Sequence, residues 1–182
     1  MLNNAPQANT IGAALSRSAR KNASKIALKF ADRQWSYQAL DEAVNKVANQ
    51  FVLLGLKKGD RVVAYGKNSD AYVLTWLATL RAGLVHVPAN FALNAQELRY
   101  VIEQSGAHAL IEDISLAATA DKAVSGTSVA IRGHFHSGSD TELDILQVAY
   151  SDASATVPRV TVQGDDLAQF LYTAGTTAAP KA

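Results

Sequence analysis

The chain of 182 residues has the length of one ordinary domain, and hydrophobic residues make up 48% of it, which is enough to bury a core. The formal net charge is +1 and no basic stripe is visible, which argues against binding nucleic acid through a patch that neutralises phosphates. Because cysteine is absent, disulfides and cysteine-based zinc sites are excluded, and a reducing compartment is compatible.

The N-terminal part predicts a surface helix rather than a targeting or membrane segment. Its basic residues are scattered, and it lacks the continuous apolar centre that precedes a signal cleavage site. Ile11, Ala14, Leu15, Ser18 and Ala19 instead share one mildly apolar helical face. The longest uncharged apolar run, residues 71–80, is too short to span a bilayer. We therefore expect a cytoplasmic protein without a membrane span.

The following segment predicts a β-hairpin and a long helix. Two β-prone runs, residues 26–30 and 33–37, are separated by only two residues, as in a hairpin. Ser36 is placed to cap a helix whose apolar residues recur at helical spacing as far as Leu54, and Gly55 ends that helix. A short strand is expected next, at residues 61–65.

Strands and helices then alternate, which indicates parallel strands. Helices are expected at residues 70–81, 95–105 and 116–124, and strands at residues 84–88, 108–112 and 128–132. Ser69 is placed to cap the first of these helices, and Asn94 with Glu97 forms a capping-box pattern before the second. The predicted fold class is α/β, with a mainly parallel sheet, flanking helices and an N-terminal β-hairpin.

The pattern weakens over residues 133–163, where only residues 143–150 look helical. We expect a surface excursion here, before the chain returns to the core at residues 167–172. No internal repeat interrupts the chain. Residues 1–182 are therefore predicted to form a single α/β domain that ends in the loop formed by residues 171–182.

Residues that carry metal-binding or catalytic chemistry elsewhere are poorly placed here. His134 and His136 would share one face of a strand, but Asp140 is the only nearby carboxylate, so two solvated loop histidines are expected. Residues 133–140 have the two glycines of a nucleotide-binding P-loop, but Ser139 stands in place of its lysine. His86 is expected to be packed in an apolar run, and His108 has no identifiable partner. No serine lies in G-x-S-x-G and no carboxylates are paired, so no catalytic residue and no metal site is predicted.

The C-terminal segment LYTAGTTAAPKA carries a possible phosphate-binding loop. Phe170, Leu171 and Tyr172 form an apolar approach that would fix the base of the loop in a sheet. The loop itself offers hydroxyl groups, a glycine and a cation, from Thr173, Thr176, Thr177, Gly175 and Lys181. Polyphosphates are bound by such combinations of backbone N–H groups, hydroxyls and an ammonium group. From these residues alone, a threonine-rich turn after a strand is an equal alternative.

The ordered set of motifs resembles the adenylate-forming enzymes, which include acyl-CoA synthetases, luciferases and non-ribosomal peptide adenylation domains. The hairpin, G-D-R-V, N-S, R-A-G before V-P, and the run L-x-x-x-E-L-x-Y-x-x-x-x-S-G-A follow the order of that family. The closing LYTAGTTAAPK is similar to the family signature YTSGTTGxPKG. The resemblance covers the chain from about Ile11 to its end and favours the phosphate loop over the turn.

The resemblance implies that a carboxylic acid is activated with ATP and Mg2+, forming an acyl-adenylate and pyrophosphate, and that the acyl group then passes to coenzyme A. By this resemblance, the phosphates of ATP would be bound by Thr173, Ala174 (through its backbone), Gly175, Thr176, Thr177 and Lys181. Alanines at 174, 178 and 182 replace residues that the family usually has as serine, threonine or glycine. We therefore expect weakened triphosphate binding.

In the family, the adenine-recognition segment, the hinge and the C-terminal lid lie beyond this loop. We therefore expect the chain to be the N-terminal part of an acyl-CoA synthetase, with a fatty acid favoured as the substrate, and to be inactive by itself. The competing hypothesis is a non-catalytic module that acts as a scaffold or interaction domain. Partners would be small-molecule substrates, and both a monomer and a homo-oligomer are compatible with the sequence.

Overall fold

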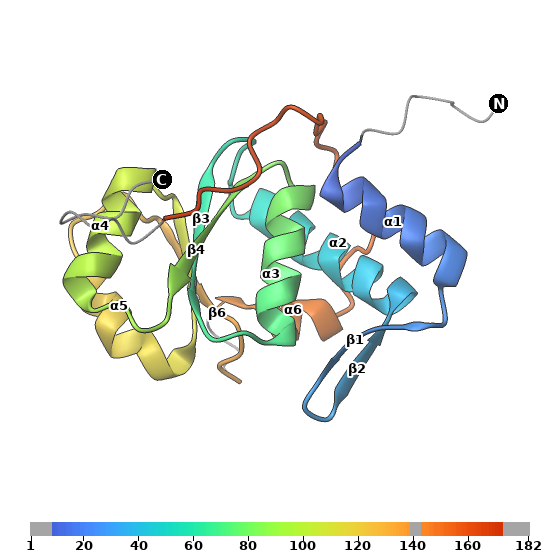
Figure 1. Ribbon diagram of the computed structural model, residues 1–182, viewed down its shortest axis with the longest axis horizontal. Coiled ribbons are helices and arrows are strands. Elements are labelled where there is room, and N and C mark those ends of the chain that lie inside the picture. The colour runs from blue at the N-terminus through green and yellow to red at the C-terminus, as the bar shows by residue number, and fades with distance from the viewer. Residues whose placement is uncertain (1–8, 139–142, 173–182) are drawn as a thin grey trace.

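The computed structural model describes residues 9–138 and 143–172, and it has three layers, with helices on both faces of a sheet (Figure 1). The five strands of this sheet pair in parallel, in the order β4-β3-β5-β6-β7. Their bounds are β3 (Arg61–Gly66), β4 (Val85–Asn90), β5 (Ala109–Glu112), β6 (Ile131–His134) and β7 (Leu143–Asp144). The predicted α/β class with a mainly parallel sheet is confirmed.

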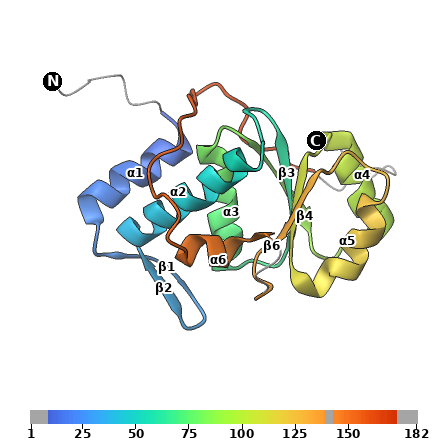
Figure 2. The same cartoon turned by 180° about the vertical axis from the view of Figure 1, so that it is seen from behind.

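Helices cover the two faces of the sheet unequally, as Figures 1 and 2 show. One face carries α1 (Ile11–Asn22), α2 (Tyr37–Leu53), α3 (Asp70–Arg81) and α6 (Ile145–Tyr150). The other carries α4 (Ala95–Ser105) and α5 (Ala117–Val124), which follows a short 3-10 helix, η1 (Ile114–Leu116). Alternate residues of β3 pack into two separate clusters, Val62 and Ala64 toward α2 and α3, Val63 and Tyr65 toward α4.

The predicted helix caps are present. The Ser36 hydroxyl accepts from the backbone N–H of Ala39 at 3.1 Å, and the Ser69 hydroxyl accepts from the third residue of α3 at 3.1 Å. Asn94 and Glu97 form a reciprocal capping box at the start of α4. These local bonds satisfy backbone donors that a helix start leaves free, so they set where α2, α3 and α4 begin.

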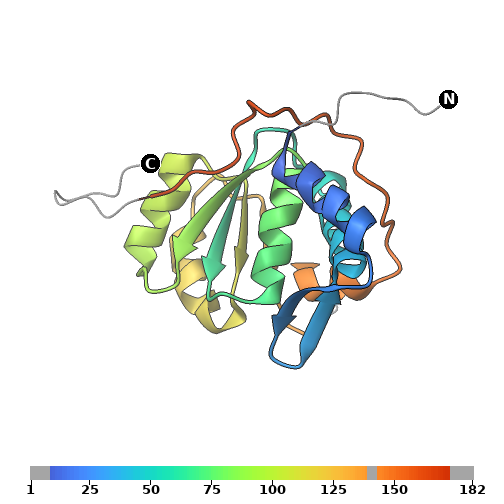
Figure 3. The same cartoon turned by 45° about the vertical axis from the view of Figure 1, so that its right-hand side comes forward.

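The hairpin of β1 (Ile26–Phe30) and β2 (Arg33–Ser36) projects from the helical layer (Figure 3). It is held to the start of α3 by Asp70, whose side chain is fully buried. The Asp70 carboxylate accepts from Arg33 Nε at 2.7 Å and Nη2 at 2.8 Å, and from Trp35 Nε1 at 3.0 Å. Burial alone would raise the pKa of Asp70, but the hydrogen bonds from Arg33 and Trp35 outweigh it and hold that pKa below its usual value.

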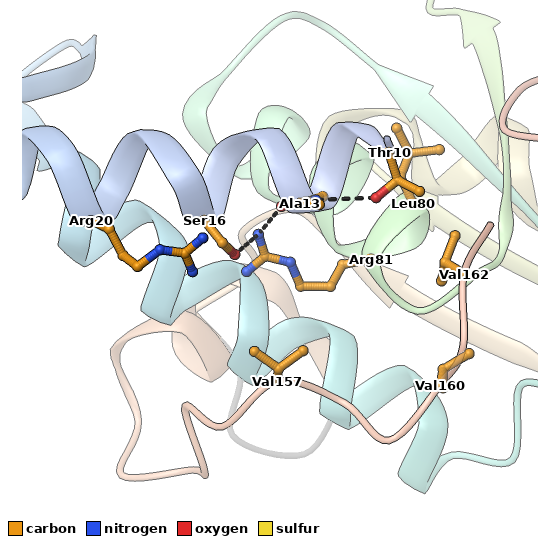
Figure 4. A pocket seen from close by; sticks show the side chains of 10 residues that line it. Thr10, Ala13, Ser16, Arg20, Leu80, Arg81, Val157, Val160 and Val162 are labelled. Atoms are coloured by element: carbon orange, nitrogen blue, oxygen red, sulfur yellow. Dashed lines mark hydrogen bonds between the residues drawn. The ribbon is translucent and has the colours of Figure 1, made fainter. Parts of the chain in front are cut away.

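The other end of α3 is held by Arg81, which is buried among α1, α2 and α3. Its guanidinium contacts Asp41 Oδ1 at 2.7 Å and donates to Asn45 Oδ1 at 2.8 Å, both on α2. It also donates to the Gly12 carbonyl at 2.8 Å and to the Ser16 hydroxyl at 3.1 Å, both on α1 (Figure 4). A cavity of about 280 Å³ lies beside it, between α1 and residues 157–162. Thus α3 is fixed by charged groups at both ends.

Residues 151–166 form a long strap without regular structure that runs over the helical layer and returns the chain to the sheet (Figures 2 and 3). Side chains of α2 bind backbone carbonyls of this strap. Asn45 Nδ2 donates to the Ala155 carbonyl at 2.9 Å, and Asn49 Nδ2 donates to those of Ser154 and Thr156 at 3.0 and 2.8 Å. The predicted surface excursion is therefore confirmed for this part of the chain.

The region after β5 differs from the prediction. Strand β6 begins at Ile131 rather than at residue 128. Before Ile131 the chain only leads onto the sheet, and the Ser128 hydroxyl donates to the Ala107 carbonyl. The strand continues through Gly133, which the sequence pattern places in the surface excursion. A Cβ on Gly133 would lie 2.7 Å from Leu143 Cγ, so glycine is what allows β7 to pair there.

The two neighbouring histidines have different environments. The expectation of a solvated loop histidine is wrong for His134, which lies on β6 and is 8% exposed because its strand pairs with β5. His136 is exposed, as expected, and Asp140 lies outside the described residues. Within residues 9–138 and 143–172, no three histidine, aspartate or glutamate side chains are grouped to hold a metal ion. Over the same residues, no helix is both long and apolar enough to cross a membrane.

Candidate phosphate-binding site

The predicted phosphate loop, residues 171–182, is described by the structure only as far as Tyr172. Its proposed ligand residues lie outside the described part of the chain: Thr173, Ala174, Gly175, Thr176, Thr177 and Lys181. Their role stays a prediction. The described residues 167–172 do show how the chain arrives at the loop, and from which part of the sheet.

Residues 168–170 pair in parallel with the outer edge of β4. The His86 N–H donates to the Ala168 carbonyl at 2.9 Å, and the Phe170 N–H donates to the His86 carbonyl at 2.9 Å. These two bonds form a single bridge between His86 and Gln169. Since the pairing is parallel, the chain runs toward the carboxyl end of β4. Ligands of open parallel sheets bind outside the carboxyl ends of the strands, so the loop begins where a phosphate site is expected.

Side chains of the arriving segment alternate between the two faces of the sheet. Phe170 and Tyr172 are partly buried and pack against the cluster that contains Val87. Gln169 points the other way, toward α3, where its side-chain oxygen accepts from Trp76 Nε1 at 3.2 Å. The prediction that an apolar approach fixes the loop base in the sheet holds for Phe170 and Tyr172, whereas Leu171 is 61% exposed.

His86 lies beneath this segment as a buried, uncharged residue. It is 2% exposed and meets the ring of Tyr72 edge-on, with ring centroids 5.8 Å apart. Burial lowers the pKa of His86 to about 4, so the imidazole is neutral at pH 7. The expectation of a packed histidine is confirmed. The His86 side chain therefore adds no charge beneath the base of the loop at pH 7.

A small cavity lies at the carboxyl ends of the strands, next to the hairpin. It has a volume of about 210 Å³ and is lined by residues that follow β3, β5 and β6, among them Lys67, Asp113 and His136. Arg33 also lines it, but its guanidinium is already paired with Asp70. The described residues that line this cavity therefore carry charges of both signs.

A cluster of charged side chains lies on the face of the sheet that α5 covers. Glu112, at the end of β5, is fully buried and pairs with Arg132 of β6, which also contacts Asp121 of α5 at 2.7 Å. Burial raises the pKa of Glu112, while Arg132 opposes this shift. Sequence reasoning missed this cluster because Glu112 and Arg132 are twenty positions apart. Strands β4 and β3 separate β5 and β6 from residues 168–170, where the chain leads into the predicted loop.

The sequence matches the AMP-binding enzyme family over residues 15–182. The chain belongs to this family. The match includes both the α/β core and the predicted loop. It confirms the resemblance to the adenylate-forming enzymes, in which this chain corresponds to an N-terminal portion.

Two curated relatives show how the family relates to this chain. Phosphinothricin tripeptide synthetase PhsC of Streptomyces viridochromogenes is 32% identical over 177 residues, which cover 94% of this chain and 15% of that protein. Crotonobetaine/carnitine–CoA ligase of Salmonella enteritidis is 27% identical over 154 residues, which cover 82% of this chain and 30% of that ligase. The chain therefore spans less than a third of the length of each of these family members.

Solved structures of the family share the fold. The anthranilate CoA ligase AuaEII in complex with anthranoyl-AMP matches with a TM-score of 0.87 at 20% identity, over 97% of this chain and 34% of that chain. ATP-bound MatB from Rhodopseudomonas palustris matches with a TM-score of 0.80 at 29% identity, over 96% of this chain and 34% of that chain. At 20% identity the first similarity establishes the fold alone.

Proposed function

We propose that this chain is the N-terminal part of an ATP-dependent acid–thiol ligase. The ligase would activate a carboxylic acid as an acyl-adenylate and transfer the acyl group to coenzyme A. The observation that carries this proposal is the family match, which extends from residue 15 through the loop to residue 182. The parallel pairing of residues 168–170 with β4 supports it, because this pairing directs the loop toward the carboxyl edge of the sheet.

In this proposal the loop binds the β- and γ-phosphates of ATP, which is used together with Mg2+. Thr173, Thr176 and Thr177 provide hydroxyls, Gly175 and Ala174 provide backbone N–H groups, and Lys181 provides the cation. During adenylation a bond forms between the substrate carboxylate and the α-phosphorus, while the bond to the leaving pyrophosphate breaks. Holding the pyrophosphate and neutralising its increasing charge lower the barrier for that displacement.

The acid is proposed to be a fatty acid, and an amino acid is the second candidate. A fatty acyl CoA synthetase from Mycobacterium tuberculosis, with a TM-score of 0.81 at 25% identity, favours the fatty acid. The similarity to a tripeptide synthetase, at 32% identity, favours the amino acid. Acid-dependent exchange of labelled pyrophosphate into ATP, measured for the whole protein with fatty acids, aryl acids and amino acids, distinguishes these classes.

The 182 residues by themselves are proposed to form one α/β domain that does not catalyse adenylation. The reason is length, because the crotonobetaine/carnitine–CoA ligase match covers only 30% of that enzyme. Adenylation requires all catalytic groups to be positioned together. Robust acid-dependent release of pyrophosphate by the 182-residue chain would contradict this part of the proposal and leave the ligase assignment intact.

The loop assignment is tested with Lys181→Ala in the whole protein. We expect pyrophosphate exchange to fall by about 100-fold, the order lost when one group that stabilises developing charge is removed. Lys122→Ala is the matched control, because Lys122 is an exposed lysine on α5. If Lys181→Ala and Lys122→Ala exchange pyrophosphate at the same rate, Lys181 is not a phosphate ligand.

A further inference from the structure

We propose that the hydrogen bond between Trp76 and Gln169 anchors the first residues of the phosphate loop, and that both residues act as positioning residues for phosphate binding. This inference rests on the proposed function of the loop. It concerns a different feature, namely how the start of the loop is held relative to the rest of the molecule.

The arriving segment has little backbone pairing to hold it. Its described contacts with β4 consist of the two hydrogen bonds that flank Gln169, rather than a complete strand ladder. The loop residue Thr173 comes only four positions after Gln169. Because so few bonds fix the backbone here, a side-chain bond at Gln169 has a large share in holding the segment in place.

The two faces of the segment are held by different interactions. On the side of α4, Phe170 makes apolar contacts, which are not directional, and Tyr172 is partly buried with its hydroxyl hydrogen-bonded to the Ser105 side chain. On the side of α3, Leu171 is 61% exposed and Gln169 is hydrogen-bonded. A hydrogen bond has a preferred distance and direction, so the Gln169 bond selects one position of the segment along β4.

The donor of this bond is itself immobilised. Trp76 lies in the middle of α3, whose first residue, Asp70, is bonded to Arg33 and whose last residue, Arg81, is bonded to Asp41. The indole N–H is only a donor, so it requires an acceptor oxygen, and the amide of Gln169 supplies one at 3.2 Å. The buried helix thus gives the loop a fixed point of attachment.

The neighbouring histidine does not compete for this role. The His86 side chain lies on the same face and packs against Tyr72. Its Nδ1 is buried without a hydrogen-bond partner, and the contact of β4 with residues 168–170 is made by the His86 backbone instead. Among the described residues on this face, Trp76 makes the polar side-chain bond to the segment.

The test compares Trp76→Phe, which removes the N–H and keeps an aromatic ring, with Gln169→Met, which removes the acceptor and keeps the side-chain length. Gln169→Glu retains an acceptor oxygen and serves as the conservative rescue. Gln34→Met, at an exposed position of β2, is the matched control for the glutamine substitution. All variants are made in the 182-residue chain, and far-UV circular dichroism verifies that each is folded.

The first measurement is amide hydrogen exchange at Phe170, whose N–H donates to the His86 carbonyl. We expect Trp76→Phe and Gln169→Met each to increase its exchange about fivefold, the size of one net neutral hydrogen bond. The double variant should exchange no faster than either single variant, because both remove the same bond. Gln169→Glu and Gln34→Met should exchange like the wild type. Unchanged exchange in the single variants, or additive increases in the double variant, would overturn the anchor.

The second measurement is the affinity for inorganic tripolyphosphate, determined by isothermal titration calorimetry. We expect Trp76→Phe and Gln169→Met to weaken binding by up to about fivefold, because an undocked loop base reduces the binding-competent population. If exchange increases while the affinity is unchanged, the bond anchors the segment but does not position the loop, and the positioning role is overturned. If the wild-type chain binds no tripolyphosphate, the positioning role fails, while the exchange data still decide the anchor and pyrophosphate exchange by the whole protein with Lys181→Ala still decides the proposed function of the loop.

Discussion

Replacing Arg33 with methionine should destabilise the protein by leaving a buried charge without its main partner. The Asp70 side chain is fully buried and accepts four hydrogen bonds, two of them from Arg33. Removing one member of a buried ion pair costs about 3–5 kcal/mol. Because the Arg33 side chain is 28% exposed, water can partly replace it, and because Trp35 and Ala71 still donate, we expect a loss of about 2–3 kcal/mol.

The assay is urea unfolding of the 182-residue chain, followed by circular dichroism at several pH values. The folded pKa of Asp70 is lowered, so its stabilising contribution is present above the unfolded pKa of about 3.9 and is lost as the pH falls through the folded value. The difference between wild type and Arg33→Met should therefore be greatest near pH 7 and shrink below about pH 4. The double variant Arg33→Met, Asp70→Asn should recover part of the loss, since it no longer buries a charge.

Two results would refute this reasoning. A loss below about 0.5 kcal/mol at pH 7 would mean that the Asp70 charge is satisfied without Arg33, as for an exposed ion pair. A loss that is the same at pH 3 and pH 7 would mean that packing of the arginine side chain, rather than its charge, stabilises the hairpin.

Two glycine-related substitutions test the backbone. Gly66→Ala should destabilise the fold by about 1–3 kcal/mol, because the new Cβ would lie 2.6 Å from the buried Phe135 ring at Cε2; an unchanged urea midpoint would show that the ring moves aside freely. Ala31→Gly should raise stability by about 0.5–1 kcal/mol, because Ala31 has a φ of 50° in the hairpin turn and glycine adopts this conformation without a steric cost; a lower melting temperature would contradict that account.

Much of the fold was predictable because it is determined locally. The capping residues Ser36, Ser69 and Asn94 start helices by bonding to backbone donors two or three positions away. The alternation of strands and helices then leaves few arrangements other than a parallel sheet. For these elements, the local pattern and the final structure agree.

The remaining features depend on residues that are distant in the sequence. Arg33 and Asp70 are 37 positions apart, and Trp76 and Gln169 are 93 positions apart, so no local pattern marks either pair. Strand β7 was missed because two residues are too few to show periodicity, and its pairing depends on the missing side chain at Gly133. Of the candidate site, the structure describes the approach through Tyr172, and the ligand residues from Thr173 onward stay a prediction.

The strap of residues 151–166 has a consequence for how this part of the sequence can vary. Asn45 and Asn49 bind carbonyl oxygens of the strap, and Lys46 does the same at the Ser151 carbonyl at 2.6 Å. Every amino acid carries the same carbonyl, so these bonds do not depend on which side chains the strap has. We expect homologous proteins to tolerate wide replacement at residues 152–156 while keeping amide side chains at the two α2 positions. The side chains that this contact requires are therefore those of α2, which lie about 100 residues before the strap in the sequence.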